Sequence, residues 1–237
     1  MKQQVVPEPA LMRELVGKYV PQADAEQAEK LVRFYEMLID RNNVMNLTAI
    51  TDPLGVAQRH FADSLLAAEL IPQGAKIIDV GTGAGFPGVP LAVMRPDISL
   101  TLLDSLNKRI LFLNDVIKEL GLSCTAVHAR AEDGARRTEL RERFDIAVSR
   151  AVAELPVLAE WTLPFVRVGG ASIMYKGPGA EEELKAASRA LALLNGKAEL
   201  LSVPTEWGER CLVTVRKTAP TGAKYPRKAG TAEKNPL

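Results

Sequence analysis

The sequence predicts an α/β protein: a doubly wound, mostly parallel sheet of seven strands that ends in an antiparallel hairpin and follows a helical N-terminal extension. From residue 76 onward, short apolar runs alternate with helix-like patterns, as in parallel βαβ units. The last two apolar runs have no helix-like segment between them, which is typical of a hairpin. Residues 8–72, by contrast, carry mostly helical periodicity.

Length and composition narrow the class of protein. A chain of 237 residues with 47% hydrophobic and 25% charged residues suits one globular domain with an extension. No apolar run reaches the roughly 18 residues of a membrane helix, and the N-terminus lacks the apolar core of a signal peptide. We therefore expect a cytoplasmic protein without membrane contact. The two cysteines, Cys124 and Cys211, belong to no metal-binding pattern, so no metal is expected.

The extension is assigned to residues 1–72. The segment Glu26–Leu38 repeats apolar residues with a period close to 3.6 and predicts one helix. A second helix is expected over 52–70, with Asp52 as its N-cap. The polar, asparagine-rich residues 41–48 between them are expected to form a loop.

The sheet is assigned to residues 73–217. The expected strands are Lys76–Val80, Leu100–Asp104, Thr125–Ala129, Phe144–Ser149, Ala171–Lys176, Glu199–Val203 and Cys211–Arg216. The expected helices are Gly88–Met94, Lys108–Leu120, Pro156–Phe165 and Ala180–Leu194. Residues 218–237 form a basic C-terminal tail. The segment from Arg216 to the end contains six basic residues and one acidic residue. Such a segment can contact phosphates but is more often only solvated.

The strongest local motif is the glycine-rich segment from Asp79 to Gly88, which follows the first strand and opens a helix. Gly81, Gly83 and Gly85 allow the backbone to approach a ligand closely. The carboxyl end of a strand near the switch point of an open α/β sheet is where such folds bind ligands. We therefore expect these glycines to line a cofactor site.

Two cofactors compete for this loop. The spacing from Gly83 to Gly88 matches the dinucleotide fingerprint. However, Phe86 and Pro87 are bulky where a pyrophosphate needs bare backbone. Asp79 also suits the cationic methionine end of S-adenosyl-L-methionine, as in the first motif of methyltransferases. A nicotinamide-dependent oxidoreductase is therefore disfavoured.

Acidic residues follow the next two strands. Asp104 ends the second strand, where an acid can accept hydrogen bonds from both ribose hydroxyls or simply cap the following helix. Ala131 and Glu132 follow the third strand, in the loop that reaches the base in this fold. There a backbone N–H and a carboxylate can bind adenine, although acids are also favourable in the first turn of any helix.

A set of short motifs runs through almost the whole chain from about Leu31. They are Asn46-Leu47-Thr48, Arg59 to Leu65, Asp79 to Pro90, Leu103-Asp104-Ser105 with Lys108-Arg109, Ser149 to Ala153, Lys176-Gly177, Tyr225-Pro226-Arg227 and Asn235-Pro236-Leu237. As an ordered set they resemble the glucose-inhibited division protein B family. Its members are bacterial 16S ribosomal RNA guanine-N7 methyltransferases with the class I, Rossmann-like methyltransferase fold.

The resemblance implies a substrate and a cofactor. The substrate would be one guanine in the decoding-region loop of 16S ribosomal RNA, as the naked RNA, the small ribosomal subunit or its precursor. Apart from the resemblance, we expect the enzyme to be a monomer. The cofactor would be S-adenosyl-L-methionine. Its implied contacts fall on Gly81, Phe86, Ala131, Glu132 and Arg150, to which the fold argument adds Asp104.

The chemistry needs little acid–base help. Guanine N7 already carries a free lone pair, so positioning can supply most of the catalysis. Arg150, at the end of the fourth strand, could bind the cofactor, orient the base through O6, or pair with an acid such as Asp79. A purely structural ion pair is the alternative, and in each case we expect a carboxylate beside it.

Five residues are candidates for RNA contact. His60 and Asp63 lie three positions apart on one helical face and could contact RNA or cover the cofactor, while His60 could equally serve only in packing. Lys176, Tyr225 and Arg227 are further candidates, Tyr225 by stacking on a base and Arg227 by neutralising phosphate.

Three other functions remain open from the residues themselves. A class I methyltransferase could act on a different RNA, a protein or a small molecule. A non-catalytic cofactor sensor or RNA-binding module is disfavoured by the intact glycine loop with Asp104. A dinucleotide-dependent enzyme would not need the final hairpin.

Overall fold

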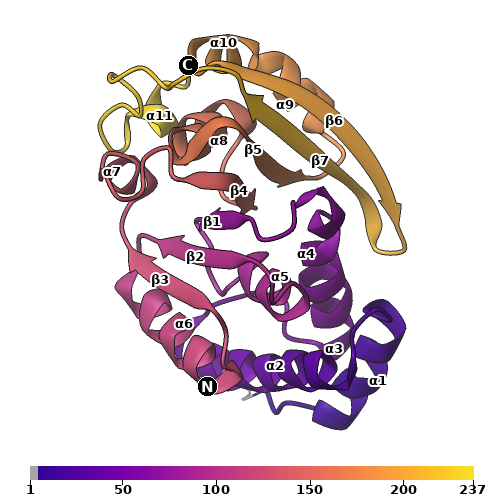
Figure 1. Cartoon of the computed structure of the whole chain (residues 1–237). Coiled ribbons are helices and arrows are strands. Elements are labelled where there is room, and N and C mark those ends of the chain that lie inside the picture. The colour runs from indigo at the N-terminus through magenta and orange to yellow at the C-terminus, as the bar shows by residue number, and fades with distance from the viewer. Residues whose placement is uncertain (1–4) are drawn as a thin grey trace.

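A computed structural model describes residues 5–237; residues 1–4, which begin the predicted extension and the segment considered as a signal peptide, lie outside the described part. Its centre is a seven-stranded sheet in the order β3-β2-β1-β4-β5-β7-β6 (Figure 1). The strands are β1 (Lys76–Val80), β2 (Ser99–Asp104), β3 (Cys124–His128), β4 (Phe144–Arg150), β5 (Val166–Lys176), β6 (Gly196–Thr205) and β7 (Gly208–Lys217). β1 to β5 pair in parallel, whereas β7 is antiparallel to both β5 and β6. The predicted fold class is confirmed.

The terminal hairpin is longer than the sequence predicted. β6 and β7 pair in register from Gly196 opposite Lys217 to Thr205 opposite Gly208. The prediction followed only the apolar core of each strand, because polar residues at the ends obscured the alternation. A backbone ladder needs no apolar side chains, so pairing continues through those polar positions.

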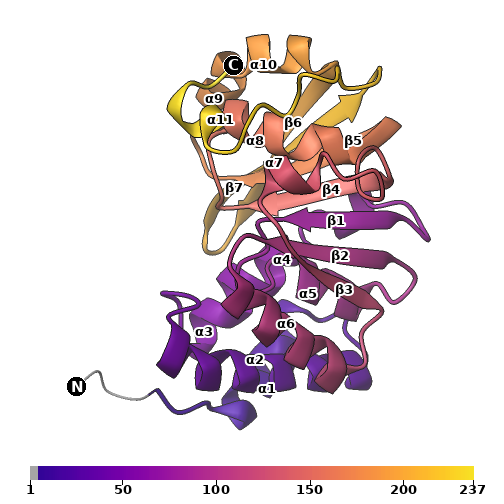
Figure 2. The same cartoon turned by 90° about the vertical axis from the view of Figure 1, so that its left-hand side faces the viewer.

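Helices cover both faces of the sheet (Figure 2). The helices that follow β1 are α5 (Gly88–Met94), α6 (Asn107–Leu120), α7 (Ala131–Gly134), α8 (Leu155–Thr162), α9 (Ala180–Ala186), α10 (Ser188–Leu193) and α11 (Thr231–Lys234). Successive strand residues point to opposite faces, so Ile77 enters one apolar cluster and Ile78 the other. The helix predicted over 180–194 is broken at Ala187 into α9 and α10.

The N-terminal extension packs as helices α1 (Pro9–Tyr19) and α2 (Ala25–Met45). The loop predicted at 41–48 is wrong up to Met45, because α2 continues that far. The side chains of two asparagines there bind neighbouring segments of the chain to the end of α2. Asn43 exchanges two hydrogen bonds with the backbone of Val5, and the Oδ1 of Asn42 accepts from Thr48 N at 2.8 Å. α2 ends where Asn46 adopts a left-handed conformation with φ of 50°.

The helix predicted over 52–70 is irregular. Asp52 caps it as predicted, accepting from Gly55 N at 2.7 Å. Helix α3 (Pro53–Gly55) then widens into the π-helical turn Val56–Ala62 before α4 (Asp63–Leu65). Such widened turns are frequent at functional sites, and this one carries His60.

The C-terminal residues lie against the domain rather than apart from it. Tyr225 and Ala232 are buried in the apolar cluster that also holds α8. Figure 1 shows α11 beside α7 and α8. Within residues 5–237, none of the helices is long and apolar enough to span a bilayer.

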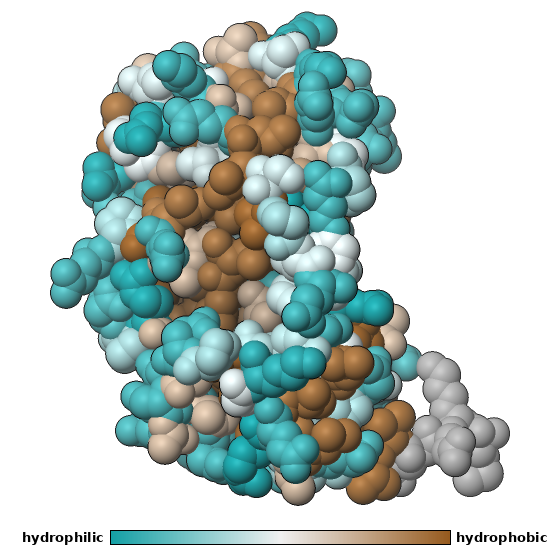
Figure 3. All heavy atoms as spheres, turned by 90° about the vertical axis from the view of Figure 1, so that its right-hand side faces the viewer, coloured by the Kyte–Doolittle hydropathy of each residue, from teal (hydrophilic) through white to brown (hydrophobic). Residues whose placement is uncertain are grey.

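One side of the molecule exposes apolar side chains. Figure 3 views the molecule from the right-hand side of Figure 1 and shows an apolar stretch along it. Leu200 and Leu201 of β6 are among the exposed large apolar residues. Leu201 also lines a shallow hollow of about 460 Å³ together with Ile173 and Thr214. This hollow shares no residue with the cavities described below.

Candidate functional site

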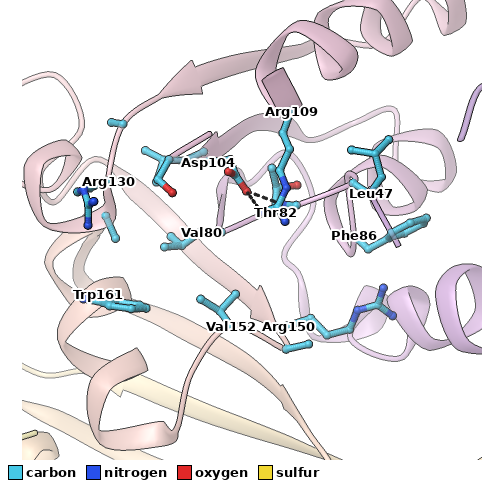
Figure 4. A pocket seen from close by; sticks show the side chains of 18 of the residues that line it. Leu47, Val80, Thr82, Phe86, Asp104, Arg109, Arg130, Arg150, Val152 and Trp161 are labelled. Carbon is cyan, nitrogen blue, oxygen red and sulfur yellow. Dashed lines mark hydrogen bonds and ion pairs between the residues drawn. The ribbon is translucent and has the colours of Figure 1, made fainter. Parts of the chain in front are cut away.

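A cavity of about 430 Å³ opens at the carboxyl ends of β1, β2 and β4, within the size range of small-ligand sites. Figure 4 shows its extent: Trp161 and Arg130 lie at one end, Asp104 at the middle, and Phe86 and Arg150 at the other end. The residues predicted from sequence that line it are His60, Gly81, Gly83, Phe86, Asp104, Ala131, Glu132 and Arg150. Asp79 and Gly85 do not line it.

The glycine loop forms one wall of the cavity, and two of its glycines could not carry a side chain without a clash. Gly81 has a φ of +76°, and a Cβ there would lie 2.8 Å from Cγ2 of Val152. Gly83 has φ of +62°, and a Cβ there would meet only the carbonyl oxygen of Gly81, at 3.9 Å. Gly85 has φ of +102°, and its Cβ would lie 2.7 Å from Cγ2 of Val89. Gly85 therefore allows the loop to pack closely on α5. The sequence predicted that Gly85 would line the cofactor site, but it does not line the cavity.

Asp79 lies beneath this loop and is completely buried. Its Oδ2 accepts from the backbone N–H of Gly88 at 2.9 Å, which fastens the strand to the start of α5. Burial raises the pKa of the Asp79 carboxyl to about 7. The predicted contact of this carboxylate with the methionine end of a cofactor is thus replaced by a supporting role under the loop.

Asp104 presents its carboxylate at the middle of the cavity. Its Oδ2 accepts from Gly83 N at 3.0 Å and from Nη1 of Arg109 at 3.1 Å, and its Oδ1 accepts from Leu106 N at 2.8 Å. α6 begins only at Asn107, so Asp104 braces the preceding turn rather than serving as the N-cap. The position fits the predicted place for binding a ribose.

At the far end of the cavity, a histidine ring lies on a phenylalanine ring. The centroids of His60 and Phe86 are 4.3 Å apart with an interplanar angle of 14°. The guanidinium of Arg150 lies over the same Phe86 ring, 5.3 Å from its centroid. The stack forms an aromatic wall where the cavity meets β4.

Arg150 has the carboxylate neighbour that the sequence led us to expect, but the neighbour is Asp63 and not Asp79. Nη1 of Arg150 lies 2.9 Å from Oδ2 of Asp63 and also donates to the carbonyl of Arg59. Oδ1 of Asp63 accepts from Nε of Arg210 at 2.6 Å and from Nε1 of Trp207 at 3.0 Å. Asp63, predicted as an RNA contact, therefore joins α4, β4 and the hairpin inside the protein.

His60 is held as a neutral ring. Its Nδ1 faces Nη2 of Arg150 at 3.3 Å and can only accept, because a guanidinium has no lone pair to offer. The proton must then lie on Nε2, which donates to Oγ1 of Thr48 at 2.9 Å. Burial, followed by the Arg150 charge, lowers the pKa of His60 to about 3.

A second cavity of about 380 Å³ adjoins the first and shares with it the residues His60, Arg150 and Ala151. Its walls are rich in cationic side chains. They come from Arg59, Arg150, Lys176 and Arg210. Lys176 is held there by Oε2 of Glu183 at 2.6 Å and by the carbonyl of Ala153 at 2.7 Å.

The two predicted tail contacts lie elsewhere. Tyr225 is 5% exposed, and the guanidinium of Arg227 is paired with the buried carboxylate of Glu160 at 2.7 Å. Neither residue lines either cavity. Sequence alone showed the basic charge but not its partner, because Glu160 is a single acid within an apolar helical pattern.

Several residues of these cavities were missed from sequence. They include Leu47, Thr48, Val152, Trp161, Arg210 and Glu233. Leu47, Thr48 and Val152 stand in motifs that the sequence singled out, so part of the signal was present. Trp161 has the sequence pattern of an ordinary core residue.

In the part of the chain that the structure describes, no cluster of His, Cys, Asp or Glu could hold a metal ion.

The sequence matches a known family over most of its length. The family model described as rRNA small subunit methyltransferase G matches residues 27–212. The protein of that name from Desulforamulus reducens is 47% identical over 211 residues, covering 86% of this chain and 88% of the relative. The one from Clostridium perfringens strain 13 is 44% identical over 233 residues, covering 96% and 98%.

Solved structures share the fold at lower identity. The O-methyltransferase from Bacillus cereus, solved in complex with SAH, has a TM-score of 0.57 at 19% identity, covering 87% of this chain and 97% of that one. The [4+2]-cyclase SpnF has a TM-score of 0.52 at 17% identity, covering 68% and 82%. A fold shared with a cyclase does not fix the reaction, which has to be argued from the site.

Proposed function

Since this chain belongs to the rRNA small subunit methyltransferase G family, we propose that it transfers a methyl group from S-adenosyl-L-methionine to N7 of one guanine in the decoding-region loop of 16S ribosomal RNA. The enzyme would work in the cytoplasm as a monomer, on the small ribosomal subunit or its precursor. What supports the proposal is the pairing of two adjoining cavities, one suited to the cofactor and the other to a nucleotide.

The first cavity fits S-adenosyl-L-methionine. Gly81 has no Cβ to press against Val152 on the cavity wall, and the Asp104 carboxylate stands at the middle as an acceptor for two ribose hydroxyls. Ala131 and Glu132 would then lie at the adenine, and Phe86 at the methionine end. When bound, the cofactor supplies a methyl group on a positively charged sulfur.

The charges near that sulfur are already balanced. A cation left unpaired beside a sulfonium would repel it. His60 stays neutral because its pKa lies at about 3, and Asp63 balances the charge of Arg150. Phe86, whose ring contacts both His60 and Arg150, completes this wall.

The second cavity supplies a place for the acceptor. Its cations suit the phosphates next to a single nucleotide drawn out of its stack. The O6 and N7 atoms of guanine form an acceptor edge that arginine can read. Arg150 stands on the wall shared by both cavities and is our candidate for orienting that edge.

The reaction itself needs no general base. The N7 lone pair forms the new bond to the methyl carbon while the carbon–sulfur bond breaks, and its electron pair stays on sulfur. The products are S-adenosylhomocysteine and a guanine whose ring carries the positive charge. No proton leaves, so the protein acts by holding the two reactants in line and excluding water.

The single observation that carries the proposal is the shared wall of His60, Arg150 and Ala151 between the two cavities. The test is methylation in vitro with methyl-labelled S-adenosyl-L-methionine. One substrate would be small ribosomal subunits assembled on unmodified 16S RNA, and the other would be subunits whose RNA carries 7-deazaguanosine at the candidate guanine. We expect label only in the first, because the analogue has carbon in place of N7. Equal labelling of both RNAs would overturn the N7 assignment.

A further inference from the structure

The C-terminal strap, defined here as residues 218–237, is fastened across α7 and α8 by two buried carboxylates. Glu160 of α8 is 1% exposed and accepts from the backbone N–H of Arg227 at 2.6 Å as well as from its guanidinium. Glu132 of α7 is 5% exposed and accepts from the backbone N–H of Gly230 at 2.9 Å. Buried carboxylates need such partners, so the strap completes the polar bonding of both helices.

Further contacts hold the strap along its length. Arg141 donates to the carbonyls of Tyr225 and Thr221, each at 2.9 Å, and Arg136 donates to the carbonyl of Pro226. These bonds occupy backbone carbonyls that have no strand or helix to bond with. The strap is thus a fixed part of the fold rather than a solvated tail.

The same strap reaches the first cavity. Glu233 of α11 lines the cavity, as do Glu132 and Trp161. Glu132 accepts from Gly230, directly before α11, and Trp161 belongs to α8, which contacts α11, so the three residues lie at one end. The indole Nε1 of Trp161 is buried there without a partner among the described residues. α7 and α8, which fasten the strap, therefore also contribute walls of that end, and Figure 2 shows α11 close to both.

This end must receive the base if the cofactor binds as proposed. The ribose would lie at Asp104 in the middle of the cavity. Phe86 and Arg150 lie at the opposite end (Figure 4), and there Arg150 also lines the second cavity, toward which the methyl group has to leave. Only the end formed by Glu132, Trp161 and Glu233 is left for the purine.

We propose that the strap completes the adenine end of the cofactor site, with the carboxylate of Glu233 accepting a hydrogen bond from the exocyclic amino group. This rests on the proposed function. The amino group donates hydrogen bonds, whereas the oxo group of hypoxanthine at the same position only accepts. A carboxylate therefore favours adenine over hypoxanthine. Arg227 is a positioning residue, because it places α11 without itself lining the cavity.

The test uses the full chain and isothermal titration with S-adenosylhomocysteine and S-inosylhomocysteine. We expect the native protein to prefer the adenosyl ligand by about fivefold or more, as one hydrogen bond to a charged group allows. Glu233→Ala should reduce that preference at least about threefold, with the remainder coming from the contacts at Ala131 and Glu132. Glu233→Gln should retain much of it, because its amide carbonyl still accepts. The matched control is Lys234→Ala, since Lys234 is exposed on the same helix and does not line the cavity.

An unchanged preference in Glu233→Ala would overturn this inference while leaving the proposed function intact. Failure of the native protein to bind S-adenosylhomocysteine would instead count against the proposed cofactor.

The positioning role of Arg227 has its own readout. Arg227→Gln should raise the KM for S-adenosyl-L-methionine several-fold while lowering kcat less. Hydrogen exchange at residues 227–234 would report whether the strap has loosened. A loosened strap with an unchanged KM would contradict the role.

Discussion

Asp63 and Arg150 lie 87 positions apart in sequence, yet Oδ2 of Asp63 is 2.9 Å from Nη1 of Arg150. Their side chains are 6% and 11% exposed, so the ion pair is nearly buried. Arg210 and Trp207 donate to the other oxygen of Asp63. One carboxylate thereby sets the position of Arg150 on the wall between the two cavities and ties the N-terminal extension to the sheet.

Asp63→Asn should destabilise the protein by about 3–5 kcal/mol, because it leaves a nearly buried guanidinium without its counter-charge. Urea unfolding measures the loss. The matched control is Glu181→Gln, which removes an exposed ion pair with Lys185 and should cause no measurable loss of stability. Equal losses in the two variants would show that Asp63 is not the centre of the network.

Stability should fall on the acid side because of His60. The pKa of this ring is about 3 in the folded protein against 6.5 ordinarily, so only the unfolded chain takes up the proton between these values. The contribution is therefore complete above pH 6.5 and is lost as pH falls toward 3, with a slope of up to ~1.4 kcal/mol per pH unit.

Urea unfolding at a series of pH values tests this. Relative to the native protein, His60→Asn should gain stability as pH falls from 6.5 to 4, whereas His128→Asn, at an exposed histidine, should keep a constant difference from the native protein. Comparing variants with the native protein also separates this effect from that of Asp79. The pKa of Asp79 is raised to about 7, so its ionisation makes stability fall as pH rises from about 4 to 7. The same slope in His60→Asn and the native protein would refute the account of His60.

The sequence predicted the sheet and part of the first cavity because both follow from local patterns. Apolar runs marked the strands, Gly81 and Asp104 lie at strand ends where the fold places its ligand, and Phe86 lies in the loop between β1 and α5. The errors have physical reasons. Asp79 looked like a ligand contact because sequence shows position but not which side of a loop a side chain occupies. Arg227 looked free because its partner Glu160 is 67 residues away.

Gly81→Ala should weaken binding of S-adenosylhomocysteine by at least about tenfold, since its Cβ would enter the space of Val152 beside the cavity. Isothermal titration gives the affinity. Gly74→Ala is a matched control because Gly74 has a similar φ of +68° with open space around it. It should cost stability through backbone strain without weakening the ligand. Similar losses of affinity in Gly81→Ala and Gly74→Ala would mean that backbone strain, and not a close approach of the loop to the ligand, weakens binding.

Asp104→Ala should also weaken this ligand at least about tenfold, because a charged acceptor for the ribose is lost. The specific test is a 2′-deoxyribose analogue of S-adenosylhomocysteine. It should bind the native protein less well than the parent ligand, but bind Asp104→Ala about equally. Asp133→Ala, an exposed acid close by, is the control and should behave as the native protein. An undiminished penalty for the analogue in Asp104→Ala would exclude Asp104 from ribose binding.

The most direct test of the proposed function is mass mapping of 16S RNA from cells that lack the gene for this protein and from cells in which it is restored. The account predicts that one N7-methylguanine in the decoding-region loop disappears on deletion and returns with the native gene. It should not return with Arg150→Ala, provided that variant accumulates to the native level. The same N7-methylguanine at equal occupancy in the deletion and native strains would contradict the account, because another enzyme would then make this modification.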